Sequence, residues 1–276
     1  MIIRTGAFYQ AFKYSIYAAL TINTVYFFIE NFAGAAYTYR DGLALTDIIV
    51  AYTDAIDTAA WLVLLLLLEL ETWVIPDAKL KGWVDALLSA LSFLCWAVIL
   101  YSFYGYVATL GVPFGFAPYA GPDPCGLAGT GAAFASSLGE YQPLDAENCL
   151  ALANGALFNA GDNMFTTPEN LSLIKRLAWT DVVNAGTWVL IVIILELEIY
   201  LQSSRLVGTI WFYAYKSFKF LLYFILIVDA AYWWMLSSPW DAWDALLWIV
   251  AFFFIEMNML SWQEENAKLR AAGEIE

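Results

Sequence analysis

Six long apolar segments constrain the fold of this chain more than any other feature. They lie near residues 10–33, 58–75, 82–108, 178–200, 209–235 and 242–262. A helix of about 20 residues crosses a hydrocarbon layer of about 30 Å, because each residue adds about 1.5 Å. A transmembrane β-strand would alternate apolar and polar residues, and these segments do not. The sequence therefore predicts an all-α integral membrane protein with six transmembrane helices.

The composition agrees with a bilayer environment. Hydrophobic residues make up 62% of the chain and the mean hydropathy is +0.66, more than a soluble domain of this size needs for its core. The net charge of −14 argues against a nucleic-acid partner, whose phosphates would be repelled. We therefore expect the lipid bilayer as the main partner, and leave open a homo-oligomer or a larger membrane complex.

The distribution of Lys and Arg predicts the orientation in the membrane, because these residues favour the cytoplasmic side. With the N-terminus inside, nine basic residues lie at or near the inner side and three outside. The inner set is Arg4, Lys13, Lys79, Lys81, Arg205, Lys216, Lys219, Lys268 and Arg270, and the outer set is Arg40, Lys175 and Arg176. We expect both termini to be cytoplasmic.

Residues 110–176 form the one sizeable polar piece, rich in Gly, Pro and Ala. No Lys or Arg occurs from Trp83 to Ile174, which favours an extracytoplasmic loop lobe. The lobe contains Cys125 and Cys149, and we expect a disulfide between them because an exterior compartment is oxidising and the chain has no His for a metal site. Cys95, inside the third segment, is expected to be a small apolar filler.

A second exterior segment, Ala33 to Asp57, places apolar residues at near-helical spacing. It is expected either to lie on the membrane surface or to extend the second span outward.

A polar motif recurs in the second, fourth and sixth apolar segments. Its pattern, D-x2-[DN]-x3-W-x7-E-x-[EN], is held without a gap. The members are Asp54, Asp57, Trp61, Glu69 and Glu71; Asp181, Asn184, Trp188, Glu196 and Glu198; and Asp241, Asp244, Trp248, Glu256 and Asn258. Chance is a poor explanation for polar identities at five matched positions inside apolar helices.

The first and fifth segments share a weaker pattern at one constant offset. Lys13, Tyr17, Asn23 and Tyr26 match Lys219, Tyr223, Asp229 and Tyr232, and the third segment fits only loosely through Tyr104. The sequence thus predicts three related helical hairpins, at about residues 8–76, 78–202 and 207–265. Parallel repeats of this kind are expected to pack with pseudo-threefold symmetry about an axis along the membrane normal.

The motif predicts two rings of carboxylates. Its first Asp, its Asp or Asn, its Trp and its first Glu fall within a helical stripe about 120° wide, with the Asp and the Glu about 22 Å apart. If these helices line the axis, Asp54, Asp181 and Asp241 form an outer ring, and Glu69, Glu196 and Glu256 form an inner ring. A carboxylate in hydrocarbon costs on the order of 3 kcal/mol or more, so these side chains should face protein or water.

Carboxylate rings along a narrow path concentrate and select cations. The leading hypothesis is therefore a small-cation or proton pathway, as a channel or a transporter, with a bound cation as the one possible cofactor. Asp57, Asn184 and Asp244 would line the same path, and Asp229 is a further candidate because it is an ionisable group deep in an apolar segment.

Packing alone is the competing interpretation of these residues. Lys13 and Lys219 are expected at about the depth of the Glu residues, and their pairing would hold the helices together without any transport. Trp61, Trp188 and Trp248 are expected close to the outer membrane interface, where indoles commonly settle as anchors.

Two other function classes stay open beside the pathway. One is a non-catalytic structural or accessory subunit of a larger membrane complex, whose aromatic surface packs against helices, lipids or pigments. The weaker one is a membrane-embedded enzyme acting on a lipid. An enzyme is less favoured, because the chain has no His and no nucleotide-binding loop, nucleophile elbow, HExxH or Cys-x-x-Cys motif.

Overall fold

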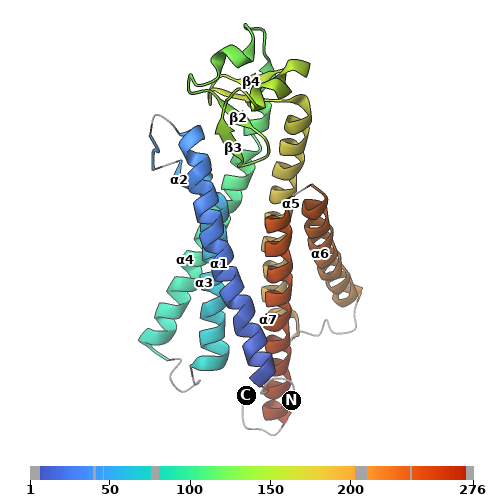
Figure 1. Cartoon of the computed structure of the whole chain (residues 1–276). Coiled ribbons are helices and arrows are strands. Elements are labelled where there is room, and N and C mark those ends of the chain that lie inside the picture. Colours follow the sequence, from blue (N-terminus) through green and yellow to red (C-terminus); the bar gives the residue numbers. More distant parts are fainter. Residues whose placement is uncertain are drawn as a thin grey trace.

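The computed structural model is a bundle of long helices with a small sheet at one end, and it describes residues 7–39, 42–45, 47–75, 81–202, 210–236 and 238–271. The long helices are α1 (Ala7–Thr38), α3 (Thr53–Glu69), α4 (Trp83–Thr109), α5 (Pro168–Gln202), α6 (Ile210–Met235) and α7 (Pro239–Ala271). They run along one common direction (Figure 1). Each packs against the next in sequence and α7 packs against α1, so the bundle closes into a ring.

Three helical segments are long and apolar enough to cross a membrane within the described part of the chain. They are Trp83–Gly115, Pro168–Leu195 and Tyr213–Met235. The other three predicted spans are helical too, but α3 has only 17 residues and the described parts of α1 and α7 are less apolar. Of the six spans expected from the sequence, the structure therefore shows three as candidate membrane spans.

The segment from Ala33 to Asp57 is divided between the end of α1 and the start of α3. Helix α1 continues to Thr38, and the short helix α2 (Ile48–Ala51) directly precedes α3 and packs against α4. Thr53 donates its hydroxyl to the Ile49 carbonyl at 2.6 Å, which joins α2 to α3. Gly105 of α4 allows this close approach, because a Cβ there would lie 2.5 Å from Thr53 Oγ1.

The polar insertion between α4 and α5 folds into a lobe around a five-stranded sheet (Figure 1). Its strands are β1 (Ala117–Pro118), β2 (Ala133–Ala135), β3 (Tyr141–Pro143), β4 (Leu157–Asn159) and β5 (Met164–Thr166). The order is β1-β4-β5-β2-β3, and every pair is antiparallel except β2 with β5. Phe134 and Phe165 form its core with Leu144 and Leu152. The sequence predicted a loop lobe here and not the sheet.

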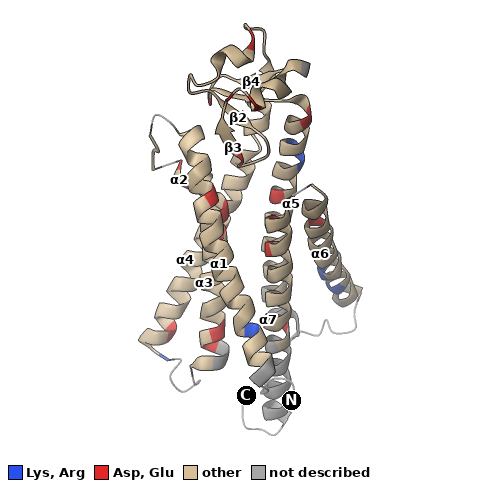
Figure 2. Cartoon of the chain, in the orientation of Figure 1, with Lys and Arg blue, Asp and Glu red and all other residues tan. Residues whose placement is uncertain are grey.

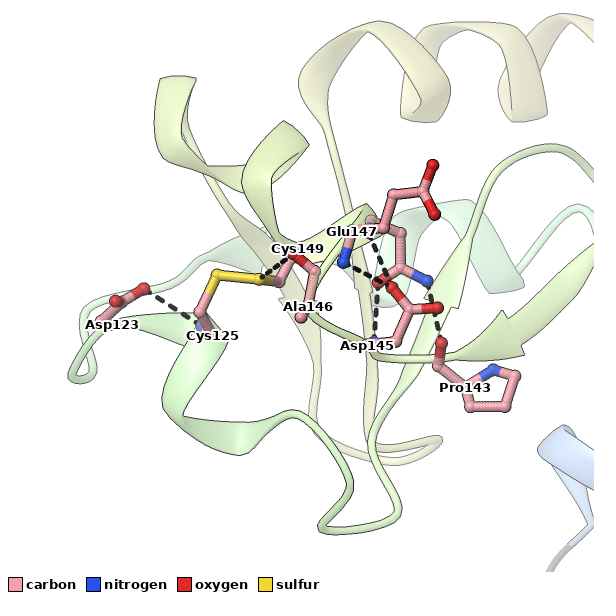
Figure 3. The surroundings of a disulfide bond; sticks show 8 residues. Asp123, Cys125, Pro143, Asp145, Ala146, Glu147 and Cys149 are labelled. Atoms are coloured by element: carbon pink, nitrogen blue, oxygen red, sulfur yellow. Dashed lines mark hydrogen bonds between the residues drawn. A yellow bond between two sulfur atoms is a disulfide. The ribbon is translucent and has the colours of Figure 1, made fainter.

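The predicted disulfide between Cys125 and Cys149 is confirmed (Figure 3). It joins two short 3₁₀ helices, Pro124–Leu127 and Asn148–Asn154. Side-chain carboxylates hold both helix starts: Asp123 accepts from the Cys125 N–H, and Asp145 accepts from the Glu147 N–H at 2.8 Å. The bond therefore ties the two sides of the lobe at points that are already fixed locally.

The third cysteine, Cys95, is buried in the apolar core between the long helices, as a small filler would be.

Charged side chains are distributed unevenly around that core. Acidic residues lie along the whole bundle, whereas the basic residues that the structure describes lie near the end opposite the lobe or on α5 close to the lobe (Figure 2).

Candidate functional site

A cavity of about 70 Å³ lies between the long helices and is bordered by side chains from all of them. We call it the aspartate cavity. The first three positions of the sequence motif meet there from α3, α5 and α7: Asp54, Asp57 and Trp61; Asp181, Asn184 and Trp188; and Asp241, Asp244 and Trp248. Residues far apart in sequence thus share one small space, with α3, α5 and α7 contributing most of its wall.

The carboxylates in the cavity accept hydrogen bonds from neutral donors. Asn31 Nδ2 donates to Asp54 at 2.9 Å, Asn23 Nδ2 donates to Asp244 at 3.0 Å, and the Tyr106 hydroxyl donates to Asp57 at 3.4 Å. Within the described residues, none of the five aspartates forms an ion pair with Lys or Arg. Neutral donors orient a carboxylate without cancelling its charge, so the described residues provide no basic partner for any negative charge in the cavity.

These polar contacts follow a cyclic order when each helix is assigned to its hairpin, α1 with α3, α4 with α5, and α6 with α7. Asn23 of α1 reaches Asp244 of α7, and Tyr106 of α4 reaches Asp57 of α3. Asp229 of α6 lies beside Asn184 of α5. The first helix of each hairpin therefore contacts the second motif position on the neighbouring hairpin.

A second cavity, of about 230 Å³, lies between the aspartate cavity and the lobe. We call it the vestibule. Leu138, Gly139 and Tyr141 of the lobe line it, together with the ends of α1, α3 and α4. The two cavities share the lining residues Phe27, Asp54, Tyr106, Asp181 and Asp241. The carboxylates are thus adjacent to open space on the lobe side.

Aromatic side chains close the aspartate cavity on its other side. Trp61, Trp188 and Trp248 are buried, and Phe252 lies among them with ring centroids at 6.0, 4.6 and 6.4 Å respectively. These indoles, which the sequence predicts near the outer membrane interface, are buried inside the bundle and form a floor above an apolar core that includes Ile191.

Two described glutamates, both at the first Glu position of the motif, are paired with lysines inside their own hairpins. The Glu69 carboxylate forms an ion pair with the Lys13 ammonium group, and both side chains are buried. Glu256 lies 3.5 Å from Lys219 Nζ and accepts from the Tyr223 hydroxyl at 2.6 Å. Neither glutamate lines the aspartate cavity.

The remaining inner positions of the motif are described only in part. The side chains of Glu196, Glu198 and Asn258 lie outside the described residues. Glu71 is half-buried in a π-helical turn, Leu70–Val74, that follows α3.

Several cavity residues were not predicted from the sequence. Tyr106, Trp233 and Asn31 lie outside the recurring motif, and the loose match of the third segment pointed instead to Tyr104, which is 58% exposed. Alternation around α4 is the signal that could separate the two tyrosines, because residues two apart lie on different faces of a helix. Trp233 directly follows the predicted Tyr232.

The carboxylates surround the cavity without converging on one point. Among the described residues, no group of three or more Asp, Glu, Cys or His side chains is placed to hold a metal ion. The arrangement can therefore hold a positively charged group in the middle of the cavity, but it does not form a ready chelate.

No protein-family model, curated protein sequence or solved structure matches this chain.

Proposed function

We propose that the chain is an integral membrane transporter that binds a small cation in the aspartate cavity. In this proposal all six long helices span the bilayer as three hairpins around a pseudo-threefold axis. The observation that carries the proposal is the set of five aspartates on one small cavity, with no Lys or Arg of the described chain paired to them.

Uncompensated charge in this place favours a cationic ligand. Ionised carboxylates inside a membrane are costly unless they are paired, hydrated or protonated, and they commonly mark ion or substrate pathways. The cavity volume of about 70 Å³ is several times the roughly 10–15 Å³ that one water molecule needs. The cavity can therefore hold a hydrated or molecular cation. A bound cation, or protons, would offset the repulsion between neighbouring carboxylates.

The closed floor favours a transporter over an open channel. Trp188 and Phe252, with the other two indoles, separate the cavity from the far half of the bundle. Transport then requires the hairpins to move relative to one another around the site, as alternating access does in repeat-built transporters.

The polar contacts suit such a movement. Ion pairs hold two hairpins together internally, Lys13 with Glu69 and Lys219 with Glu256. Contacts between hairpins at the cavity are neutral hydrogen bonds, such as Asn23 to Asp244. The stronger interactions therefore lie within hairpins and the more easily exchanged ones lie between them, which supports rigid hairpins that rock as units.

The disulfide supports an orientation with the lobe outside. Disulfides persist in oxidising compartments, and Cys125 and Cys149 are joined. We therefore place the lobe on the extracytoplasmic side and both termini on the cytoplasmic side, with the vestibule facing outward.

Flux into liposomes tests the transport proposal. The purified full chain is reconstituted, and proton, Na⁺, K⁺ and methylammonium uptake are measured for the wild type and for the double variant Asp57→Asn/Asp244→Asn. We expect at least a tenfold loss of flux in the double variant, because two charges at the centre of the site are removed without changing its shape. Asp85→Asn, which changes an exposed carboxylate on α4, is the matched control and should keep full flux.

Two outcomes would contradict this function. Equal flux in the double variant and the control would exclude the aspartate cavity as the path. A well-folded wild type that carries none of the four cations would overturn transport altogether. It would favour the second candidate, a structural subunit of a larger membrane complex, for which the buried Lys13–Glu69 pair is a helix-fixing contact.

A further inference from the structure

The chemistry of the cavity wall indicates the class of cation. Resting on the proposed function, we propose that the ligand is a compact organic ammonium that also carries one hydrogen-bond acceptor, as a small amino alcohol does, and is not a bare metal ion.

A bare metal ion fits this wall poorly. Hard cations such as Mg²⁺ and Ca²⁺ take six or more oxygen ligands at about 2.0–2.6 Å. Here no three acidic side chains of the described chain are close enough to share one ion. The floor consists of Trp61, Trp188 and Trp248, and indole rings attract ammonium groups through their negative faces while excluding water. Aromatic rings beside separate carboxylates suit an ammonium group with attached carbon.

Two unused donors on the wall indicate that the ligand also carries an acceptor. The indole N–H of Trp233 makes no hydrogen bond although Asp181 lies nearby, and the side chain is only 6% exposed. Asn184 Nδ2 is likewise buried and makes no hydrogen bond, although Asp229 lies beside it. An ammonium group has no lone pair to offer these donors. Buried donors without a partner are costly, so an acceptor atom on the ligand would stabilise the complex.

The side chain at the second motif position differs between the helices that line the cavity. Asn184 and Trp233 come from the adjacent helices α5 and α6, whereas Asp57 and Asp244 come from α3 and α7, which both pack against α1. The second motif position is thus acidic on two helices and an amide on the third. A ligand with a positive end toward Asp57 and Asp244 and an acceptor toward Asn184 matches this asymmetry at the second motif position.

The cavity volume limits the size of the ligand. At roughly 10–15 Å³ for each water-sized group, about 70 Å³ accommodates about five to seven non-hydrogen atoms. Ethanolamine is within this limit and carries both required groups. Ethylammonium has the same charge and nearly the same shape but no acceptor, so it is the matched probe.

Calorimetric titration of the purified full chain in detergent micelles tests the inference, with ethanolamine, ethylammonium, Na⁺ and Mg²⁺ as the probes. We expect wild type to bind ethanolamine about threefold to tenfold more tightly than ethylammonium, the range that one additional hydrogen bond gives. Trp233→Phe keeps the ring and removes the N–H, and it should reduce this ratio to about one while ethylammonium affinity changes less than about twofold. Trp234→Phe, at a 69% exposed position on the same helix, should leave the ratio unchanged.

The ratio of two affinities within one variant is insensitive to a fraction of misfolded protein, which protects the test from a folding defect. Asn184→Asp provides a second variant of the same shape, and it should also lower the ratio because it replaces a donor with a charge. Equal binding of the two amines to wild type, an unchanged ratio in Trp233→Phe, or binding of Na⁺ or Mg²⁺ alone would overturn the ligand class and leave cation transport standing. Absence of binding and of flux for every cation would instead overturn the proposed function.

Discussion

Replacing Lys13 with Met tests whether the buried ion pair holds the first hairpin together. Lys13 is 1% exposed and Glu69 is 6% exposed, and the hydroxyls of Tyr14 and Tyr17 also lie 3.4 Å from the Glu69 carboxylate oxygens. Removal of one partner leaves a buried charge without compensation, which costs about 3–5 kcal/mol. Two neutral tyrosine donors remain, so we expect Lys13→Met to lower the free energy of unfolding by about 3 kcal/mol, at the lower end of this range.

The second hairpin pair provides an internal control for this magnitude. The side chains of Lys219 and Glu256 are 17% and 24% exposed, so solvent screens their interaction more strongly. Lys219→Met should therefore cost about 1 kcal/mol. The double variant Lys13→Met/Glu69→Gln removes both buried charges, and it should recover most of the loss caused by Lys13→Met alone.

Equilibrium unfolding in mixed detergent and SDS micelles measures these differences through tryptophan fluorescence. A cost of Lys13→Met below about 1 kcal/mol would refute the reasoning, because membrane hydrogen bonds that are free to find other partners average about 0.6 kcal/mol. Strict additivity in the double variant would refute it as well, since the two residues would then not be coupled.

Three further predictions concern the lobe and the packing of α4. Replacing Cys125 with Ser opens a cross-link between residues 24 apart and should destabilise the lobe by about 3 kcal/mol, measured by denaturant unfolding with and without reductant. Gly105→Ala should lower the free energy of unfolding by about 1–3 kcal/mol, because the new Cβ would lie 2.5 Å from Thr53 Oγ1. In the control Gly126→Ala the new Cβ meets no atom within 4 Å, so stability should change by less than about 1 kcal/mol. Burial raises the pKa of Tyr141 to about 12, above its ordinary value of 10.0. The free energy that the neutral phenol contributes to the stability of the lobe is therefore fully present below pH 10 and should be lost as the pH rises from 10 to 12. A titration of tyrosinate absorbance, run alongside unfolding of the lobe, would detect this loss.

Much of the helical layout follows from the sequence because apolar runs bounded by polar turns leave few alternatives. The expected helix at 82–108 is found as Trp83–Thr109, and that at 209–235 as Ile210–Met235. The disulfide was predictable because two cysteines share one polar insertion, without Lys or Arg up to Ile174, in a chain without His. The sheet was not, because strands such as Ala133–Ala135 are too short to show an alternating pattern.

The candidate site was predicted only in part, for reasons that the structure makes clear. The motif positions Asp57 and Asp244 were identified from spacing alone, and the structure brings them to one cavity. The sequence placed the tryptophans on the same helical stripe as the aspartates, but spacing alone does not show that the stripe faces the other helices. Glu69 was ambiguous because a carboxylate at that depth suits a pore and a Lys partner equally well, and the fold pairs it with Lys13.

The burial of Cys95 has a practical consequence for locating the two ends of the bundle. The other two cysteines are oxidised, so Cys95 is the chain's single thiol, and it is only 7% exposed. A membrane-impermeant maleimide should therefore leave the wild-type protein unlabelled. A cysteine introduced at Thr38, on the vestibule wall, would then report by its labelling alone which side of a sealed vesicle the lobe faces.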